Sequence, residues 1–327
     1  MLYMQRYRKF SEEYQTFLLH FFSIIFVFAF FALRLSNSKK TISKMQIIRS
    51  VAELKSAIEN FKKQGKTVGL VPTMGALHDG HASLVSKCRK ENEVAVVSVF
   101  VNPTQFNNKT DLATYPRDEK KDAELLESLG VDIMFAPQPE DVYSEREMSQ
   151  TFDFDFQGLD KVMEGLQRPG HFNGVVQIVS KLFTFVTPDK AYFGEKDFQQ
   201  VAIIKLMVRT MGFNIEIVQC PIVREESGLA RSSRNQLLSE AERKNAANIF
   251  RVLKESVNFV PSKSPADLTQ WVIDNINACD GLQVEYYEIV NGDTLQKINS
   301  WDDAGYVVGC VTVHCGKVRL IDNIRLK

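Results

Sequence analysis

The chain has 327 residues, with 40 Lys or Arg against 40 Asp or Glu, so its formal net charge is zero. Residues 1–44 hold seven basic and two acidic side chains, and the remaining 283 residues therefore carry a net charge of −5. Such a body lacks the basic face that nucleic acid requires, so we expect no nucleic-acid partner. The length predicts two domains, and five scattered cysteines favour a reduced, cytoplasmic protein.

The first 44 residues differ in character from the rest. Residues 17–35 are nineteen mostly apolar positions, enough to cross a bilayer, and the cations that follow would leave the body on the cytoplasmic side. A signal peptide fits less well, because residues 36–38 (Ser-Asn-Ser) make a weak cleavage site. A third interpretation, which we favour, is that translation begins at Met45, since the chemistry described below needs nothing from the extension. A membrane contact is expected only if the extension is present.

Residues 45–223 alternate apolar runs with amphipathic stretches, which is typical of βαβ units in a parallel sheet. The apolar runs predict strands at 67–71, 94–100, 131–136, 191–193 and 215–218. The amphipathic stretches predict helices at 52–63, 81–90, 118–129, 175–185 and 198–211. We therefore expect a Rossmann-like α/β domain that binds a nucleotide over 45–223.

A charged turn at 224–228 marks the expected domain boundary. Beyond it, the pattern predicts helices at 240–257 and 266–278 and strands at 284–290, 306–314 and 318–321. Residues 224–327 should thus form a smaller α+β domain, placed as a lid or on the side of a dimer contact.

Two histidines, His78 and His81, lie in a glycine-bearing turn between a predicted strand and a predicted helix. Ligands bind at the carboxyl ends of strands in open α/β sheets, and a helix amino terminus favours an anion. The pattern predicts a site for nucleotide phosphates. A His-x-x-His pair can also be half of a metal site, but His20, His171 and His314 show no ligand spacing with a cysteine.

Several further motifs follow in order along the chain. They are Ser98–Phe106 (SVFVNPTQF), Tyr115–Arg117 (YPR), Arg168–Val175 (RPGHFNGV), Gly194–Gln200 (GEKDFQQ), Arg231–Asn235 (RSSRN) and Arg319–Asn323 (RLIDN). With the histidine motif, they make the chain resemble the HxGH-type nucleotidyltransferases and, more narrowly, the pantoate–β-alanine ligase family. The resemblance runs from about Met45 to the carboxyl end. It implies ATP-dependent joining of pantoate to β-alanine through a pantoyl adenylate, with release of pyrophosphate and AMP.

The resemblance also implies a nucleotide site. His81 would stabilise the transition state or donate a proton, with His78 and Lys196 as the other catalytic side chains. Gly194 and Asp197 would lie at the ribose, and Ser232, Ser233 and Arg234 would grip the phosphates. The expected ATP-binding residues are Met74, Gly75, Ala76, Leu77, His78, Asp79, Gly80, His81, Gly194, Glu195, Lys196, Asp197, Val223, Arg231, Ser232, Ser233 and Arg234.

The second part of the expected site is a small-molecule pocket. Gln105 and Gln200 match the glutamines that bind pantoate in the family, and Gln105 also lies near β-alanine. Pro72, Met74 and Phe106 would line this pocket, and Asn102 would help to hold its wall. Mg²⁺ is the expected counter-ion of ATP, held mainly by phosphate oxygens, with Asp122 as a contact from the protein. A homodimer is also implied.

Some residues and functions remain open at this stage. His171 and Arg117 are interpreted as structural, His171 through a hydrogen bond to the backbone. Arg231 stands where the family often has Leu or Met, and its cation could grip phosphate or face solvent. Two other functions compete with the ligase: a nucleotidylyltransferase of the same superfamily, and a membrane-tethered binding protein without catalysis.

Overall fold

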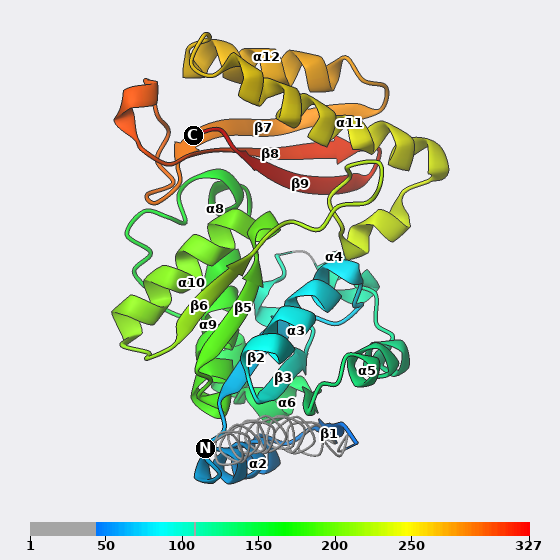
Figure 1. The fold of residues 1–327 in the computed structure, drawn as a ribbon, viewed down its shortest axis with the longest axis vertical. Coiled ribbons are helices and arrows are strands. Elements are labelled where there is room, and N and C mark those ends of the chain that lie inside the picture. Colours follow the sequence, from blue (N-terminus) through cyan, green and yellow to red (C-terminus); the bar gives the residue numbers. More distant parts are fainter. Residues whose placement is uncertain (1–43, 108) are drawn as a thin grey trace, which may run out of the picture. The chain divides into compact units, whose positions relative to one another are not determined.

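The chain folds around two β-sheets in the part that the computed structural model describes, residues 44–107 and 109–327 (Figure 1). The larger sheet has six strands in the order β1-β4-β3-β2-β5-β6, and all of its pairings are parallel. Its strands are β1 (Gln46–Ile48), β2 (Val68–Thr73), β3 (Val94–Val99), β4 (Ile133–Phe135), β5 (Lys190–Gly194) and β6 (Glu216–Cys220).

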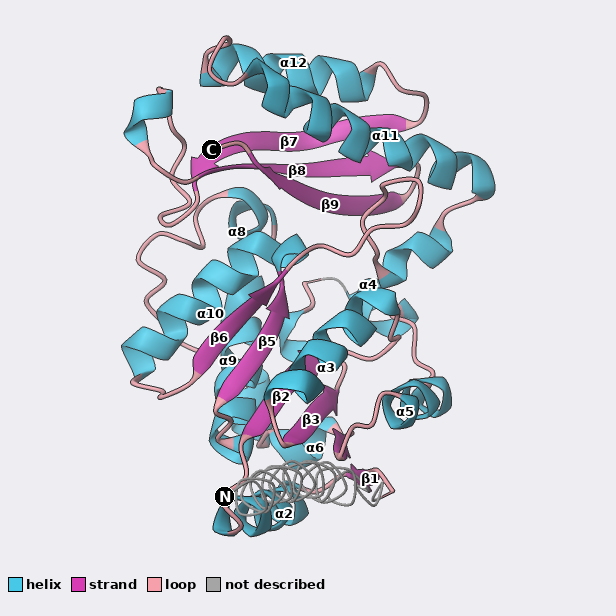
Figure 2. Ribbon diagram, in the orientation of Figure 1, coloured by secondary structure: helices cyan, strands magenta, loops and turns pink. Residues whose placement is uncertain are grey.

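Helices connect these strands and cover both faces of the sheet (Figure 2). They are α2 (Val51–Lys63), α3 (Asp79–Glu91), α4 (Lys109–Thr114), α5 (Glu119–Ser128), α6 (Pro139–Val142), α7 (Glu145–Ser149), α8 (Met163–Gln167), α9 (His171–Val186) and α10 (Phe198–Met211). Short 3-10 helices η1 (Pro103–Gln105) and η2 (Glu195–Asp197) follow β3 and β5.

The two faces of the parallel sheet bury two separate apolar clusters. On β3, Val94 and Val96 pack with α9 and α10, whereas Ala95 and Val97 pack with α3. Successive strand residues point to opposite faces, and here both faces are covered by helices. A continuous apolar run such as VAVVSV therefore becomes a central strand rather than an alternating one.

The order of the strands determines where a ligand can bind. From β2 the chain moves to β3 and β4 on one side, and then returns to place β5 on the other side of β2. The connections therefore diverge at the carboxyl ends of β2 and β5. This point of reversal is where open α/β sheets leave a crevice for ligands. The turns after β2 and β5 carry the two histidines and Lys196, respectively.

The second sheet is antiparallel, with β7 (Leu282–Asn291), β8 (Val307–Cys315) and β9 (Val318–Arg325) in that order. Helices α11 (Glu240–Ser256) and α12 (Pro265–Asn277) pack on one of its faces, which buries Val252 and Val272 against Val311 and Val313. The opposite face is turned toward the parallel sheet (Figure 1). The remaining elements are the 3-10 helices η3 (Ser233–Leu237), η4 (Val257–Phe259) and η5 (Trp301–Asp303).

The expected fold class, a Rossmann-like parallel sheet with a smaller α+β part after it, is confirmed. Helix α10 has the predicted bounds, and Gly212 closes it with φ 69°. Several elements begin earlier than predicted. Among them, α3 starts at Asp79, because His78 caps it, and α9 starts at His171. Strand β9 continues four residues beyond the predicted end, and β1 and the short helices α4, α6, α7 and α8 were not predicted.

Residues 44–327 form one compact unit. The predicted boundary between 223 and 224 falls after the last strand of the parallel sheet and before η3 and α11, and we retain it as a proposed division. Among residues 44–107 and 109–327, no helix has both the length and the apolar character to cross a membrane. The apolar run at 17–35 lies outside the described residues.

Candidate active site

The turn between β2 and α3 has an unusual backbone that one buried side chain holds. Gly75 and Ala76 both have positive φ, 82° and 50°. A Cβ at Gly75 would lie 3.0 Å from Asp122 Oδ2, so glycine suits both the conformation and the space. Asp122 from α5 accepts hydrogen bonds from the Ala76 and Leu77 N–H groups, at 3.0 and 2.7 Å. Its carboxylate therefore sets the path of the chain into α3.

The two histidines cap the helix that they begin. His78 is the N-cap residue of α3, and its Nδ1 accepts from the Gly80 N–H at 3.1 Å. His81 Nδ1 accepts from the His78 N–H at 3.4 Å, which completes a capping box. A neutral imidazole has one donor and one acceptor nitrogen, so the network puts each proton on Nε2. Both Nε2–H groups remain available to a ligand.

Both imidazoles are held in the neutral form. Burial, with Lys196 next in importance, lowers the pKa of His78 to about 4. Burial, followed by the proximity of His78 and then Lys196, lowers the pKa of His81 to about 3. The rings lie side by side, with centroids 4.1 Å apart. At neutral pH the pair offers two hydrogen-bond donors rather than two cations.

The turn after β5 supplies the positive charge. Lys196 lies in η2, and its side chain is 19% exposed, with Nζ 3.8 Å from Asp197 Oδ1. Because β5 pairs with β2, this turn and the histidine turn lie at the same edge of the sheet. The ammonium group is thus close enough to influence both imidazoles electrostatically.

A loop from the C-terminal part faces these groups. Ser232 caps η3 by accepting from the Arg234 N–H at 3.3 Å. Glu225 holds the loop, since it accepts from Asn235 at 3.0 Å and from Arg243 at 2.6 Å. Arg231 Nη2 lies 3.0 Å from Asp79 Oδ2, so this cation bridges the loop and the start of α3. Arg231 therefore does not simply face solvent.

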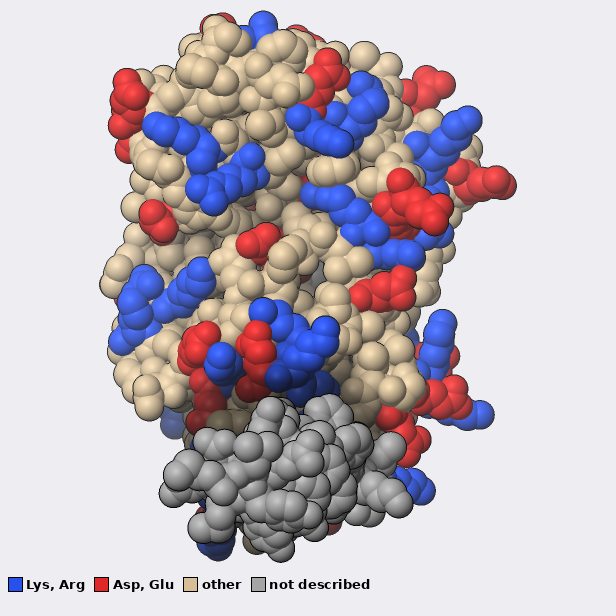
Figure 3. Space-filling model, viewed as in Figure 1, with Lys and Arg blue, Asp and Glu red and all other residues tan. Residues whose placement is uncertain are grey.

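A cavity of about 230 Å³ brings most of the predicted residues together. It lies where the turns after β2 and β5 meet the loop before η3. The predicted residues that line it are Met74, His78, Gly80, His81, Gln105, Gly194, Lys196, Asp197, Gln200, Val223, Arg231, Ser232, Ser233 and Arg234, together with Pro72 and Asn102. Acidic and basic side chains are intermixed over the face of the molecule seen in Figure 3.

Several expected residues lie outside this lining. They are Gly75, Ala76, Leu77, Asp79, Glu195, Asp122 and Phe106. Phe106 packs edge-on against Tyr115 instead, with centroids 5.7 Å apart. Asp122 is 3% exposed and both of its oxygens accept from backbone N–H groups, which fits a residue that holds the turn better than a metal contact. Arg117 donates to the carbonyls of Tyr115 and Leu112, as expected of a structural residue.

The glutamine side of the cavity is held by a chain of hydrogen bonds. Asn102 Nδ2 donates to Gln105 Oε1 at 3.1 Å and to the Gly174 carbonyl at 3.0 Å. His171 Nδ1 lies 2.8 Å from the Gln105 carbonyl, which agrees with the expected backbone contact. Arg168 Nη1 lies 3.2 Å from His171 Nε2; a guanidinium can only donate, so His171 carries its proton on Nδ1. Asn102 and His171 thus fix the side chain and the backbone of Gln105.

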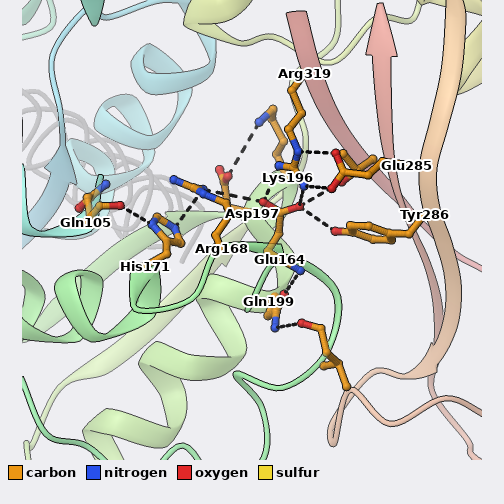
Figure 4. A network of polar contacts seen from close by, with 12 residues as sticks. Gln105, Glu164, Arg168, His171, Lys196, Asp197, Gln199, Glu285, Tyr286 and Arg319 are labelled. Atoms are coloured by element: carbon orange, nitrogen blue, oxygen red, sulfur yellow. Dashed lines mark hydrogen bonds and ion pairs between the residues drawn. The ribbon is translucent and has the colours of Figure 1, made fainter. Parts of the chain in front are cut away.

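A second, larger cavity of about 660 Å³ adjoins the first and shares Lys196, Asp197, Gln200, Ser232 and Arg234 with it. Charged groups from the small sheet and from helix α8 meet at its wall (Figure 4). Arg319 of β9 donates to Glu164 of α8 at 2.7 and 2.8 Å and to Glu285 of β7 at 2.8 and 2.9 Å. Burial of Glu164 opposes its ionisation, but the hydrogen bonds and the charge of Arg319 outweigh burial and lower the pKa of Glu164 to about 2.

Sequence reasoning predicted Pro72 and Met74 in the apolar wall of the smaller cavity but missed most of the rest. One face of α9 contributes Val175, Ile178, Val179 and Leu182, and Phe100, Tyr192, Phe193, Pro221 and Ile222 complete it. The spacing of three and four residues on α9 was visible, but it does not distinguish a pocket wall from a core face. Only the tertiary structure separates the two.

Fold and site together define a class of protein. The chain has a parallel sheet with a His-x-Gly-His helix start at its point of reversal, and a lysine turn and a Ser-Ser-Arg loop lie opposite. This combination is that of an α/β nucleotide-binding enzyme of the HxGH type. The family model for pantoate-beta-alanine ligase matches residues 46–325. The chain belongs to the pantoate–β-alanine ligase family.

Relatives and solved structures agree with this membership. Pantothenate synthetase of Phocaeicola vulgatus is 57% identical over 284 residues, which cover 86% of this chain and 100% of the relative. Pantothenate synthetase of Porphyromonas gingivalis is 53% identical over 281 residues, which cover 86% of this chain and 99% of the relative. The crystal structure of pantothenate synthetase from Thermus thermophilus has a TM-score of 0.80 at 40% identity, over 86% of this chain and 99% of that one. The pantoate-beta-alanine ligase from Francisella tularensis was solved in complex with beta-gamma ATP and beta-alanine. Its TM-score is 0.73 at 36% identity, over 86% of this chain and 98% of that one.

Proposed function

We propose that this chain joins pantoate to β-alanine at the expense of ATP, and forms pantothenate, AMP and pyrophosphate. The observation that carries the proposal is that a single cavity is lined both by groups suited to phosphate and by groups suited to a small hydroxy acid. Groups suited to phosphate (His78, His81, Lys196 and Arg234) line it together with two glutamines, Gln105 and Gln200, and with apolar side chains. Such a cavity suits a reaction between a nucleotide and a small hydroxy acid.

The first step activates the carboxyl group. A pantoate carboxylate oxygen attacks the α-phosphorus of ATP, the bond from that phosphorus to the oxygen of the β-phosphate breaks, and pyrophosphate leaves. Negative charge develops on the oxygens of the five-coordinate phosphorus, and donors placed in advance stabilise it. The Nε2–H groups of His78 and His81 serve as donors, and Lys196 adds a full charge. Ser232, Ser233 and Arg234 hold the departing pyrophosphate.

The second step uses the adenylate. The amine of β-alanine attacks the acyl carbon, the nitrogen loses a proton, and the bond from that carbon to the AMP oxygen breaks. Gln105 lies at the junction of the glutamine wall and the histidine turn, since its Nε2 is 2.9 Å from Met74 Sδ. This place suits a contact with both pantoate and β-alanine.

The pantoate subsite combines amides with apolar surface. An amide donates to a carboxylate and accepts from a hydroxyl, whereas a carboxylate side chain only accepts. Gln105 and Gln200 supply the amides, and the α9 face and Phe100 pack against the branched methyl groups of pantoate. This is the usual composition of a small-molecule site, apolar walls with a few placed polar groups.

Mg²⁺ accompanies the nucleotide in this proposal. Among the described residues, no cluster of three or more His, Cys, Asp or Glu is arranged to hold a metal ion. Mg²⁺ typically binds through phosphate oxygens and water rather than through a protein cage, so the surroundings fit a metal that arrives with ATP. Its chemistry there is to neutralise phosphate charge.

We further propose a homodimer that works in the cytoplasm. The resemblance to the family supports the dimer. The need for ATP supports the compartment, and so do the cysteines: Cys88, Cys220, Cys279, Cys310 and Cys315 are all free thiols. Neither a membrane-tethered binding protein nor a nucleotidylyltransferase is favoured by the family match.

Product analysis tests the function. The purified protein is incubated with ATP, Mg²⁺ and pantoate, with and without β-alanine, and pyrophosphate and AMP are followed separately. We expect pyrophosphate up to one equivalent of enzyme without β-alanine, and free AMP only after β-alanine is added. A stable nucleotide-containing product that forms with an acceptor phosphate would identify a nucleotidylyltransferase instead.

A further inference from the structure

The motif Arg319–Asn323 lies far from the nucleotide groups in sequence, and the mechanism above does not use it. It forms part of β9, an edge strand of the small sheet, and its polar residues contact segments outside that sheet. Arg319 contacts Glu164 of α8, Asp322 contacts Arg224, and Asn323 contacts the turn η2 that carries Lys196. The last of these contacts reaches a catalytic element directly.

Asn323 donates to two successive peptide carbonyls of that turn. Its Nδ2 lies 2.8 Å from the Glu195 carbonyl oxygen and 3.1 Å from the Lys196 carbonyl oxygen. The side-chain amide has two N–H groups, so one amide can serve both acceptors. Asn323 is only 8% exposed, so water competes little for these bonds.

The orientation of Asn323 is itself fixed. Its backbone N–H donates to Asp322 Oδ1 at 2.8 Å. That carboxylate accepts hydrogen bonds from Nη1 and Nη2 of Arg224, at 2.6 and 2.9 Å, and it is 5% exposed. A bidentate pair of this kind is geometrically specific. The Asp322–Arg224 pair therefore fixes the backbone of β9 at the point where the Asn323 amide meets the turn.

The other side of the turn is tied to the parallel sheet. Glu195 Oε1 accepts from Gln219 of β6 at 3.2 Å, and Gln219 Oε1 accepts from Lys205 of α10 at 2.7 Å. The turn is thus held between β6 and β9. The contacts that hold the turn are made at Glu195 and at the carbonyl of Lys196, and Lys196 itself lines both cavities.

We propose that Asn323 is a positioning residue for Lys196: it fixes the η2 backbone so that the ammonium group faces the phosphates in the adenylation step. The inference rests on the proposed function. A charge that is placed before the reaction stabilises a transition state without reorganisation, and a misplacement of 1 Å can cost about a hundredfold in rate. The competing role is a contact that only joins the two sheets.

The variant Asn323→Asp separates these roles. It keeps the size of the side chain but turns a carboxylate toward two carbonyl oxygens and removes both donors. Pyrophosphate release from ATP and pantoate is measured under single-turnover conditions, with titration of ATP and of pantoate and with thermal melting alongside. We expect the maximal rate to fall by about ten- to a hundredfold with little change in the half-saturating ATP concentration.

Tyr286→Phe is the matched control. Tyr286 of β7 donates to Glu164 Oε1 of α8 at 2.8 Å, which also joins the small sheet to the parallel-sheet part, but Tyr286 does not contact the Lys196 turn. Its loss should lower stability and leave the adenylation rate close to that of the wild type. The pH adds a second readout: protonation of the carboxyl in Asn323→Asp restores one donor, so its rate relative to the wild type should rise from pH 8 to pH 6.

The measurements on Asn323→Asp and Tyr286→Phe either support or overturn the positioning role of Asn323. A folded Asn323→Asp enzyme with the wild-type adenylation rate overturns the inference, and so does a loss of rate that Tyr286→Phe shares in proportion to its loss of stability. If Asn323→Asp does not fold, Asn323→Ser, which keeps one donor, is measured against the same control and judged by the same two criteria. A wild-type protein that releases no pyrophosphate refutes the proposed function, and the inference falls with it.

Discussion

Replacement of Asp122 by Ala tests whether this carboxylate holds the histidine turn or contacts the metal. The carboxylate accepts two backbone hydrogen bonds, from Ala76 and Leu77, in a place where the side chain is 3% exposed. A hydrogen bond to a charged group contributes about 1.5–3 kcal/mol, so the loss of both costs about 3–6 kcal/mol. Burial raises the pKa of Asp122 above its ordinary value, which shows that desolvation offsets part of this gain. We therefore expect the lower end of the range.

The assay is thermal unfolding together with a titration of Mg²⁺ in the pyrophosphate-release reaction. At about 2 °C per kcal/mol for a unit of this size, a loss of about 3 kcal/mol should lower the midpoint by roughly 6 °C. Asp122→Asn keeps the volume and one acceptor, and should lose about half as much. The magnesium requirement should stay unchanged in both variants. Wild-type melting of Asp122→Ala, with a raised magnesium requirement as its only defect, would refute the reasoning and restore the metal contact.

Four further outcomes are expected. Replacement of His81 by Ala should slow pyrophosphate release by about a hundredfold or more with the fold intact, because a placed donor is lost; near-normal release would contradict this role. Replacement of Gln105 by Ala should raise the half-saturating pantoate concentration far more than that of ATP, and equal effects in the two titrations would argue against the assignment. A protein without residues 1–44 should keep its activity, since every proposed site residue lies in 45–327, and a well-folded but inactive truncation would show otherwise. Burial lowers the pKa of His171 to about 4, below its value of 6.5 in the unfolded chain, so its contribution to stability is complete above pH 6.5 and is lost as the pH falls toward 4. In His171→Asn, the free energy of unfolding measured with urea should therefore fall less between pH 6.5 and pH 4, by at most about 3 kcal/mol. An unchanged dependence of this free energy on pH would exclude the idea.

The sequence by itself determined the fold class and most of the longer elements, and it predicted which residues would form the nucleotide site. Local signals suffice where an element is specified by its own residues. Helix α10, for example, has apolar periodicity and a glycine that closes it at φ 69°. The histidine turn could be predicted as a phosphate site because a strand, a glycine turn and a helix start have that property wherever they occur. The start of α3 was misplaced because the cap is His78, whereas Ser, Thr, Asp and Asn are the usual signals.

Only the tertiary structure decided which residues support the site. Asp122 lies 45 residues from Leu77 along the chain, and Asn323 lies 127 residues from Lys196. No local pattern distinguishes these side chains from other polar residues at the ends of elements. The apolar face of α9 has the same spacing whether it meets a core or a cavity. Such contacts depend on the order of strands and on the packing of one sheet against another, which local propensity does not encode.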